Sequence, residues 1–101
     1  MGIHAELSAD AQVLTIRVTG RFDYASHTSF RTAYESLAVR PKRYVIDLAL
    51  AQYLDSSALG MLLLLREHAG GDKAKIKVLN CQADVKNILL IANFDKLFQI
   101  E

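Results

Sequence analysis

The residues with the clearest chemical potential are two adjacent serines, Ser56 and Ser57, which directly follow Asp55. They stand where a run of strong helix formers begins, and the first backbone N–H groups of a helix lack partners inside it. The ordinary role of serine there is to cap the helix with its side-chain oxygen. The alternative is a hydroxyl that accepts a phosphate, because a helix start tolerates an anion. The residues alone leave both roles open, and capping is the commoner one.

The other reactive side chains do not form a recognisable catalytic pattern. The three histidines are His4, His27 and His68, and no Gly-x-Ser-x-Gly turn surrounds Ser56, so the sequence does not indicate a serine hydrolase. It contains neither a glycine-rich phosphate loop nor a His-Glu-x-x-His pair. The single cysteine, Cys81, excludes an intramolecular disulfide and a thiolate-rich metal site. We therefore expect no enzymatic activity, no metal and no cofactor.

Length and composition narrow the classes of protein that the chain can be. Its 101 residues, 51% apolar and 23% charged, predict one domain over residues 1–101. Twelve basic against eleven acidic residues give a net charge of +1, too small an excess for charge-driven nucleic-acid binding. The first ten residues do not resemble a secretory signal, and the longest apolar run, Ala58 to Leu65, is too short to insert across a membrane. A cytoplasmic location is expected.

The spacing of apolar residues predicts the element order ββαβαβαβ. Single strands alternate with helices in the second half, which favours parallel pairing there, and an opening hairpin adds an antiparallel part. The fold class is therefore α/β, with a mixed, mostly parallel β-sheet and helices packed on it. The expected elements are strands at Ile3 to Leu7 and Val13 to Val18, a helix from about Ser26 or Thr28 to Ala38, a strand at Tyr44 to Leu50, a helix at Ala58 to Ala69, a strand at Lys75 to Leu79, a helix at Asp84 to Asn93 and a strand at Leu97 to Ile100.

Two of these strands carry further expectations. The apolar run from Tyr44 to Leu50 is interrupted only by Asp47, which is typical of a central strand covered on both faces. Alternating lysines, Lys73, Lys75 and Lys77, are typical of a solvated strand edge that resists aggregation, more than of an anion site.

The helix after Ser57 has more leucines than one contact face can bury. On a helical wheel, Ala58, Leu62, Leu65 and Ala69 share the side expected to face the core, and Gly60 and Glu67 lie opposite. Leu63 and Leu64 flank the core direction on both sides, so one sheet cannot cover them fully. Either neighbouring helices cover these leucines, or they form an apolar surface for a partner.

Two segments of the sequence resemble a known family. Tyr44-Val-Ile-Asp47-Leu48, followed by Asp55-Ser56-Ser57-Ala58-Leu59-Gly60, is similar to the central strand and the Asp-Ser-x-Gly-Leu-Gly signature of STAS domains of the anti-sigma factor antagonist type. Upstream, Gly20-Arg21-Phe22-Asp23 resembles the turn that follows the second strand of these domains. The resemblance covers nearly the whole chain in the same element order.

The resemblance implies a bacterial partner-switching regulator of signal transduction and transcription. Its unphosphorylated form would bind a serine kinase that is often itself an anti-sigma factor, phosphorylation on Ser56 would release that partner, and a PP2C-type phosphatase would reverse the change. Asp55 would shape the loop around Ser56, and Ser57 would cap or support the helix. The residues expected at the partner surface are Asp23, Asp55, Ser57, Gly60, Leu63, Leu64 and Glu67.

The sequence is also compatible with a second function, and it differs from the family pattern in three places. The alternative is a STAS subunit that does not switch, in a lipid-transport ATPase or a signalling scaffold. Ala58 stands where the family commonly has glycine, Ala49 replaces a small hydroxyl residue, and the sequence ends at Glu101, just after the last expected strand, where many relatives carry a further helix. The oligomeric state is not fixed by the sequence.

Overall fold

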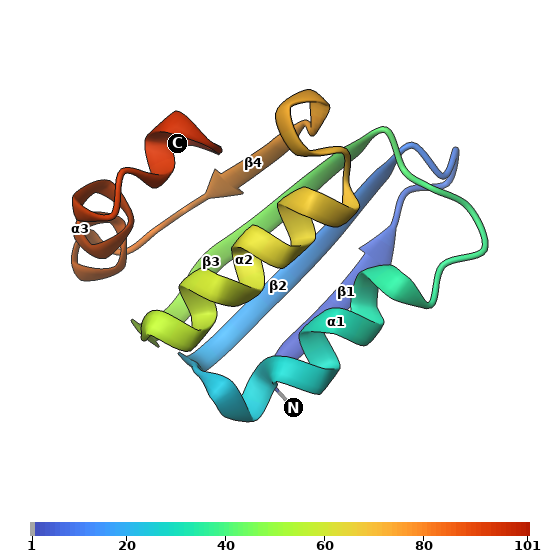
Figure 1. Cartoon of the computed structure of the whole chain (residues 1–101). Coiled ribbons are helices and arrows are strands. Elements are labelled where there is room, and N and C mark those ends of the chain that lie inside the picture. The colour runs from blue at the N-terminus through green and yellow to red at the C-terminus, as the bar shows by residue number, and fades with distance from the viewer. Residues whose placement is uncertain (1) are drawn as a thin grey trace.

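The computed structural model describes residues 2–101, which form one five-stranded sheet with three α-helices (Figure 1). The strands lie side by side in chain order. β1 pairs antiparallel with β2, and the other neighbours are parallel, which confirms the mixed, mostly parallel sheet and the order ββαβαβαβ. The elements are β1 Ile3–Leu7, β2 Val13–Phe22, α1 His27–Glu35, β3 Arg43–Leu54, α2 Ser56–His68, β4 Ile76–Leu79, α3 Ala83–Ile91 and β5 Gln99–Ile100, with short 3-10 turns at Tyr24–Ser26 (η1), Gly71–Lys73 (η2) and Phe94–Lys96 (η3).

The helices cover one face of the sheet and leave the other open. Each crossover between parallel strands advances by one strand in the same direction, and right-handed crossovers of this kind place successive helices on the same side. Accordingly, Tyr44, Ile46 and Leu48 of β3 are buried, whereas Val45 and Asp47 between them are only half-buried. The expectation that this strand is covered on both faces is therefore wrong.

Lys77 of β4 and Lys75, just before this strand, also lie on the open face. β4 pairs with β3 on one side and β5 on the other, so the expectation of a strand edge is wrong. Ile76 and Val78 of this strand face the core, and Lys75 and Lys77 alternate with them and are exposed.

The long pair β2–β3 determines how the far end of the sheet is built. Along it the register shifts twice, and each time β3 has one residue more than β2. Gly20, with a φ of +74°, allows β2 to bend at the second shift. The shifts turn Leu50 and Tyr53 to the surface, where they are 64% and 40% exposed, and restore the core-facing register at Leu54.

Candidate functional site

Two aspartates occupy equivalent places at the carboxyl ends of β2 and β3. The last residues of these strands, Phe22 and Leu54, are paired across the sheet, and Asp23 and Asp55 follow them directly. The Oδ1 of Asp23 accepts a hydrogen bond from the backbone N–H of Ala25 (3.1 Å), so that Asp23 caps η1. The backbone N–H of Asp55 donates to the carbonyl oxygen of Phe22 (3.3 Å). The expected position of Asp23, at the same end of the sheet as Ser56, is confirmed.

Asp55 is the cap of α2. Its Oδ1 accepts a hydrogen bond from the backbone N–H of Ala58 (3.0 Å), and α2 begins at Ser56. The expectation that Ser56 or Ser57 provides the cap is therefore wrong, because the aspartate before them already takes that place. Within residues 2–101, neither serine hydroxyl makes a hydrogen bond, and Ser56 is exposed while Ser57 is half-buried. The Ser56 hydroxyl is free for chemistry at the first position of a helix.

The cap can be tested through the stability of the fold. We expect Asp55→Ala to lower the free energy of unfolding by about 1 kcal/mol, which corresponds to a drop of about 5 °C in Tm for a chain of this size. Asp55→Asn keeps an oxygen that can accept the same hydrogen bond, so its Tm should stay close to that of the unchanged chain. Thermal unfolding followed by circular dichroism measures both. An equal loss in both variants would contradict the capping role.

A cationic and aromatic pair lies next to these aspartates. The guanidinium of Arg21 lies 4.1 Å from the ring centre of Tyr53, and its Nε is 3.3 Å from Oδ2 of Asp23. Tyr24 is 70% exposed and stacks on His27, whereas Phe22 between Arg21 and Asp23 is buried in the core. Exposed aromatic side chains and arginine are typical of protein-protein contacts. The contacts of Arg21 with Tyr53 and Asp23 were not predicted from the sequence, although Arg21 lies in the turn Gly20-Arg21-Phe22-Asp23 that stands out in it.

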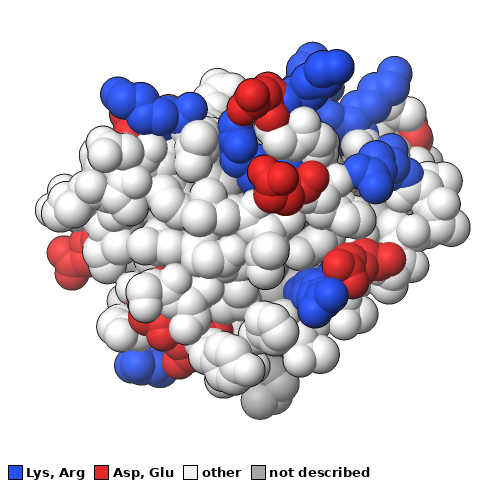
Figure 2. All heavy atoms as spheres, viewed as in Figure 1, with Lys and Arg blue, Asp and Glu red and all other residues white. Residues whose placement is uncertain are grey.

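An uncharged stripe runs along the outward face of α2. Ser56, Gly60 and Leu63 recur at helical spacing and are all exposed, and Leu64 beside them is 55% exposed. The next exposed position of this row, Glu67, is charged and ends the stripe. A Cβ added at Gly60 would meet no atom within 4 Å, so packing inside this chain does not require glycine there. In Figure 2, uncharged surface covers the middle of the face on which α2 lies, with charged groups toward its borders.

The helical wheel correctly predicted which side of α2 faces the core. The structure also shows which of the two alternatives for Leu63 and Leu64 is right. Ala58, Leu62 and Leu65 are buried against the sheet. Leu63 is 39% exposed, so the interpretation that neighbouring helices cover Leu63 and Leu64 is wrong. The structure brings the free hydroxyl and two capping aspartates together at one end of the molecule, where the open apolar face of α2 begins.

The remaining reactive groups lie in other settings. Cys81 is half-buried, packs against the core, and has the pKa of its thiol raised by burial. His68 packs on Tyr34 with ring centres 4.9 Å apart. Among residues 2–101, no three His, Cys, Asp or Glu side chains are placed to hold a metal ion together. No helix in this range is both long enough and apolar enough to cross a membrane.

Comparison with known proteins gives a consistent result. A family model described as "Mlab, STAS domain" matches residues 5–99. The STAS-domain containing protein PA14_20770 of Pseudomonas aeruginosa is 59% identical over 100 residues, which cover 99% of each chain. The fold is similar to an anti-sigma factor antagonist from Mycobacterium paratuberculosis, with a TM-score of 0.79, 22% identity, and coverage of 97% of this chain and 84% of that one.

Two further solved structures have similar folds. The antisigma-factor antagonist STAS domain from Rhodobacter sphaeroides is 31% identical, with a TM-score of 0.54 and coverage of 78% of this chain and 85% of that one. The STAS domain of a SulP transporter from Vibrio cholerae is 15% identical, with a TM-score of 0.64 and coverage of 86% of this chain and 70% of that one. Similar folds thus occur both in sigma-factor regulation and in a transporter.

Proposed function

Because this chain belongs to the STAS domain family, we propose that it is a non-enzymatic cytoplasmic regulator that changes its binding partner when Ser56 is phosphorylated. The observation that carries the proposal is the capping of α2 by Asp55, which leaves the exposed Ser56 hydroxyl without a structural task. The Rhodobacter sphaeroides relative, an antisigma-factor antagonist, supports the same class of function.

A phosphate on Ser56 is compatible with the fold. In the transfer, the Ser56 oxygen would attack the γ-phosphorus of ATP bound to a serine kinase, ADP would leave, and the hydroxyl proton would pass to the kinase. The product adds nearly two negative charges at the first residue of α2, where the helix dipole favours an anion. Hydrolysis by a PP2C-type phosphatase would restore the hydroxyl. Neither state needs α2 to unfold.

The partner surface would combine the Ser56 turn with the outer face of α2. The half that we propose to sense the phosphate consists of Asp23, Asp55 and Ser57, and the half that packs consists of Gly60, Leu63, Leu64 and Glu67. A partner seated on both halves would place its own groups close to Ser56. The phosphate would then release the partner through desolvation and repulsion. We propose a serine kinase or anti-sigma factor as that partner.

Phosphosite mapping tests the proposal directly. The unchanged chain, Ser56→Ala and Ser57→Ala are each incubated with ATP in lysate of the organism that encodes the protein, and the products are mapped by mass spectrometry. We expect phosphate on Ser56 in the unchanged chain and in Ser57→Ala, and none on Ser56→Ala. An unphosphorylated Ser56 in a lysate that phosphorylates other proteins would contradict the proposal.

The second candidate is a STAS subunit that holds one partner constantly, in a lipid-transport ATPase or a signalling scaffold. The similar fold of the Vibrio cholerae transporter domain favours it. The two candidates differ in a measurable way, since a constant subunit would keep its partner whatever the charge at position 56. A serine kinase or phosphatase gene beside the gene for this chain would support switching, and a permease gene would support transport.

A further inference from the structure

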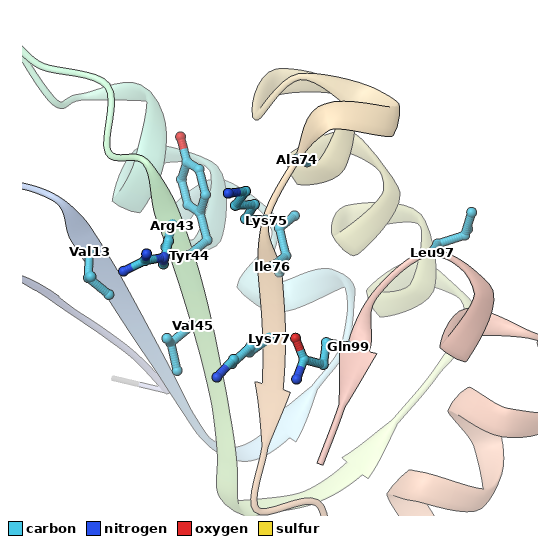
Figure 3. Close-up of a pocket in the computed structure, with 10 residues that line it drawn as sticks. All are labelled: Val13, Arg43, Tyr44, Val45, Ala74, Lys75, Ile76, Lys77, Leu97 and Gln99. Atoms are coloured by element: carbon cyan, nitrogen blue, oxygen red, sulfur yellow. The ribbon is translucent and has the colours of Figure 1, made fainter.

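A cavity of about 450 Å³ lies on the open face of the sheet, at the end opposite Ser56. It is lined at the amino-terminal ends of β2, β3 and β4 and next to the start of β5 (Figure 3). By the strand register, Val13 pairs with Arg43 and Val45 pairs with Lys77, so these four side chains share the uncovered face. The volume falls in the usual range for small-molecule sites.

The lining combines an apolar floor with a cationic rim. Val13, Val45 and Leu97 supply apolar surface, and Arg43, Lys75 and Lys77 supply three positive charges, with no carboxylate among the lining residues. Within residues 2–101, Arg43 and Lys75 form no ion pair, and Lys77 meets only Glu101, at 3.7 Å between Nζ and Oε2. In Figure 3, Arg43 and Lys77 lie on either side of Val45, Gln99 lies beside Lys77, and Lys75 extends toward the ring of Tyr44.

The charges and the apolar surface of this cavity indicate which kind of ligand it would favour. Lys77 already has Glu101 as a counter-charge, but Arg43 and Lys75 form no ion pair within residues 2–101, so an anion placed near both gains Coulombic attraction. The apolar residues add no binding free energy for a fully hydrated inorganic ion, but they stabilise a bound ligand that has an apolar body. Lys75 and Lys77, expected at a solvated strand edge, instead lie just before and within β4, an interior strand of the sheet, and both line the cavity.

We propose that this cavity binds a small amphipathic anion, which has one carboxylate or phosphate head and an apolar body. The head would lie among Arg43, Lys75 and Lys77, and the body would cover Val13, Val45 and Leu97. Each methylene buried on this floor should strengthen binding by about fourfold. The site is separate from the Ser56 turn, so binding here does not depend on the proposed partner switch.

The test uses the full chain labelled with ¹⁵N and titrated with octanoate, octyl phosphate and octanol in NMR experiments. We expect saturable shifts of the Val13, Val45, Lys77 and Gln99 amides with at least one of the two anions, with a Kd of about 1 mM or tighter. The tighter anion identifies the head group. Octanol should bind at least about tenfold more weakly, and hexanoate about 15-fold more weakly than octanoate. Scattered or non-saturable shifts with both anions would overturn the proposal.

A matched pair of charge reversals locates the head group. Lys75 lines the cavity, and Lys73, two residues earlier in η2, is also exposed but does not line it. Lys75→Glu should weaken binding of the anion by about tenfold and Lys73→Glu by no more than about twofold. Equal effects of the two variants would overturn the proposed site. Ser56→Asp should leave this Kd unchanged, which separates the test from that of the partner switch.

Discussion

Ser56→Asp is expected to weaken binding of the serine kinase or anti-sigma factor that recognises the unphosphorylated chain by about 100-fold. A carboxylate of the partner about 6 Å from the new charge would cost about 2.8 kcal/mol at an effective dielectric constant near 20, which corresponds to that factor in Kd. A full phosphate carries nearly twice the charge, so it approaches the roughly 10⁴-fold change that moves a partner from bound to free. Isothermal titration calorimetry with the purified partner measures the Kd.

Two variants separate charge from size and from position. Ser56→Asn has almost the shape of Ser56→Asp without its charge, and we expect a loss of less than about fivefold. Ser57→Ala should change the Kd by no more than about twofold, because Ser57 is half-buried and the substitution adds no charge to the proposed surface. The charge at position 56 favours α2 by about 0.3 to 1 kcal/mol through the helix dipole, so unfolding cannot explain the loss. Unchanged affinity of Ser56→Asp would rule out release by charge.

The element order and the sheet type could be predicted because local patterns determine them. Alternation in β2 and β4 and the helical spacing in α2 each indicate one element type. The coverage of the sheet could not be read from β3, because an apolar run such as Tyr44 to Leu50 looks the same whether one face or two are buried. The deciding factor is the direction of successive crossovers, which depends on the order of all five strands.

The candidate site was only partly predictable for a similar reason. The acid-serine pair Asp55-Ser56 and the turn at Asp23 mark the correct end of the sheet. Which residue caps α2 depends on one hydrogen bond, from the backbone N–H of Ala58 to Asp55. The sequence alone cannot decide this, because Asp and Ser are about equally favoured as helix caps. The exposed places of Leu50 and Tyr53 come from the register shifts between β2 and β3, and no local pattern encodes such shifts.

Two adjacent leucines of α2 should separate folding from binding. Leu62 has no exposed surface and packs in the core, so Leu62→Ala is expected to lower the free energy of unfolding by about 3 kcal/mol. This is a large part of the 5 to 15 kcal/mol typical of such domains. Leu63 is 39% exposed, and Leu63→Ala should cost less than about 1 kcal/mol. Urea unfolding followed by circular dichroism gives both values.

Leu62→Ala has the larger effect on stability, but Leu63→Ala should have the larger effect on partner binding. Leu63 lies on the uncharged stripe with Ser56 and Gly60, so its truncation removes apolar surface from the proposed interface, and we expect about a tenfold rise in Kd. The folded fraction of Leu62→Ala should keep the affinity of the unchanged chain, because Leu62 faces the sheet. If Leu63→Ala binds normally while Ser56→Asp does not, the partner contacts the Ser56 turn alone. If both bind normally, the partner uses another surface, and the constant-subunit function gains support.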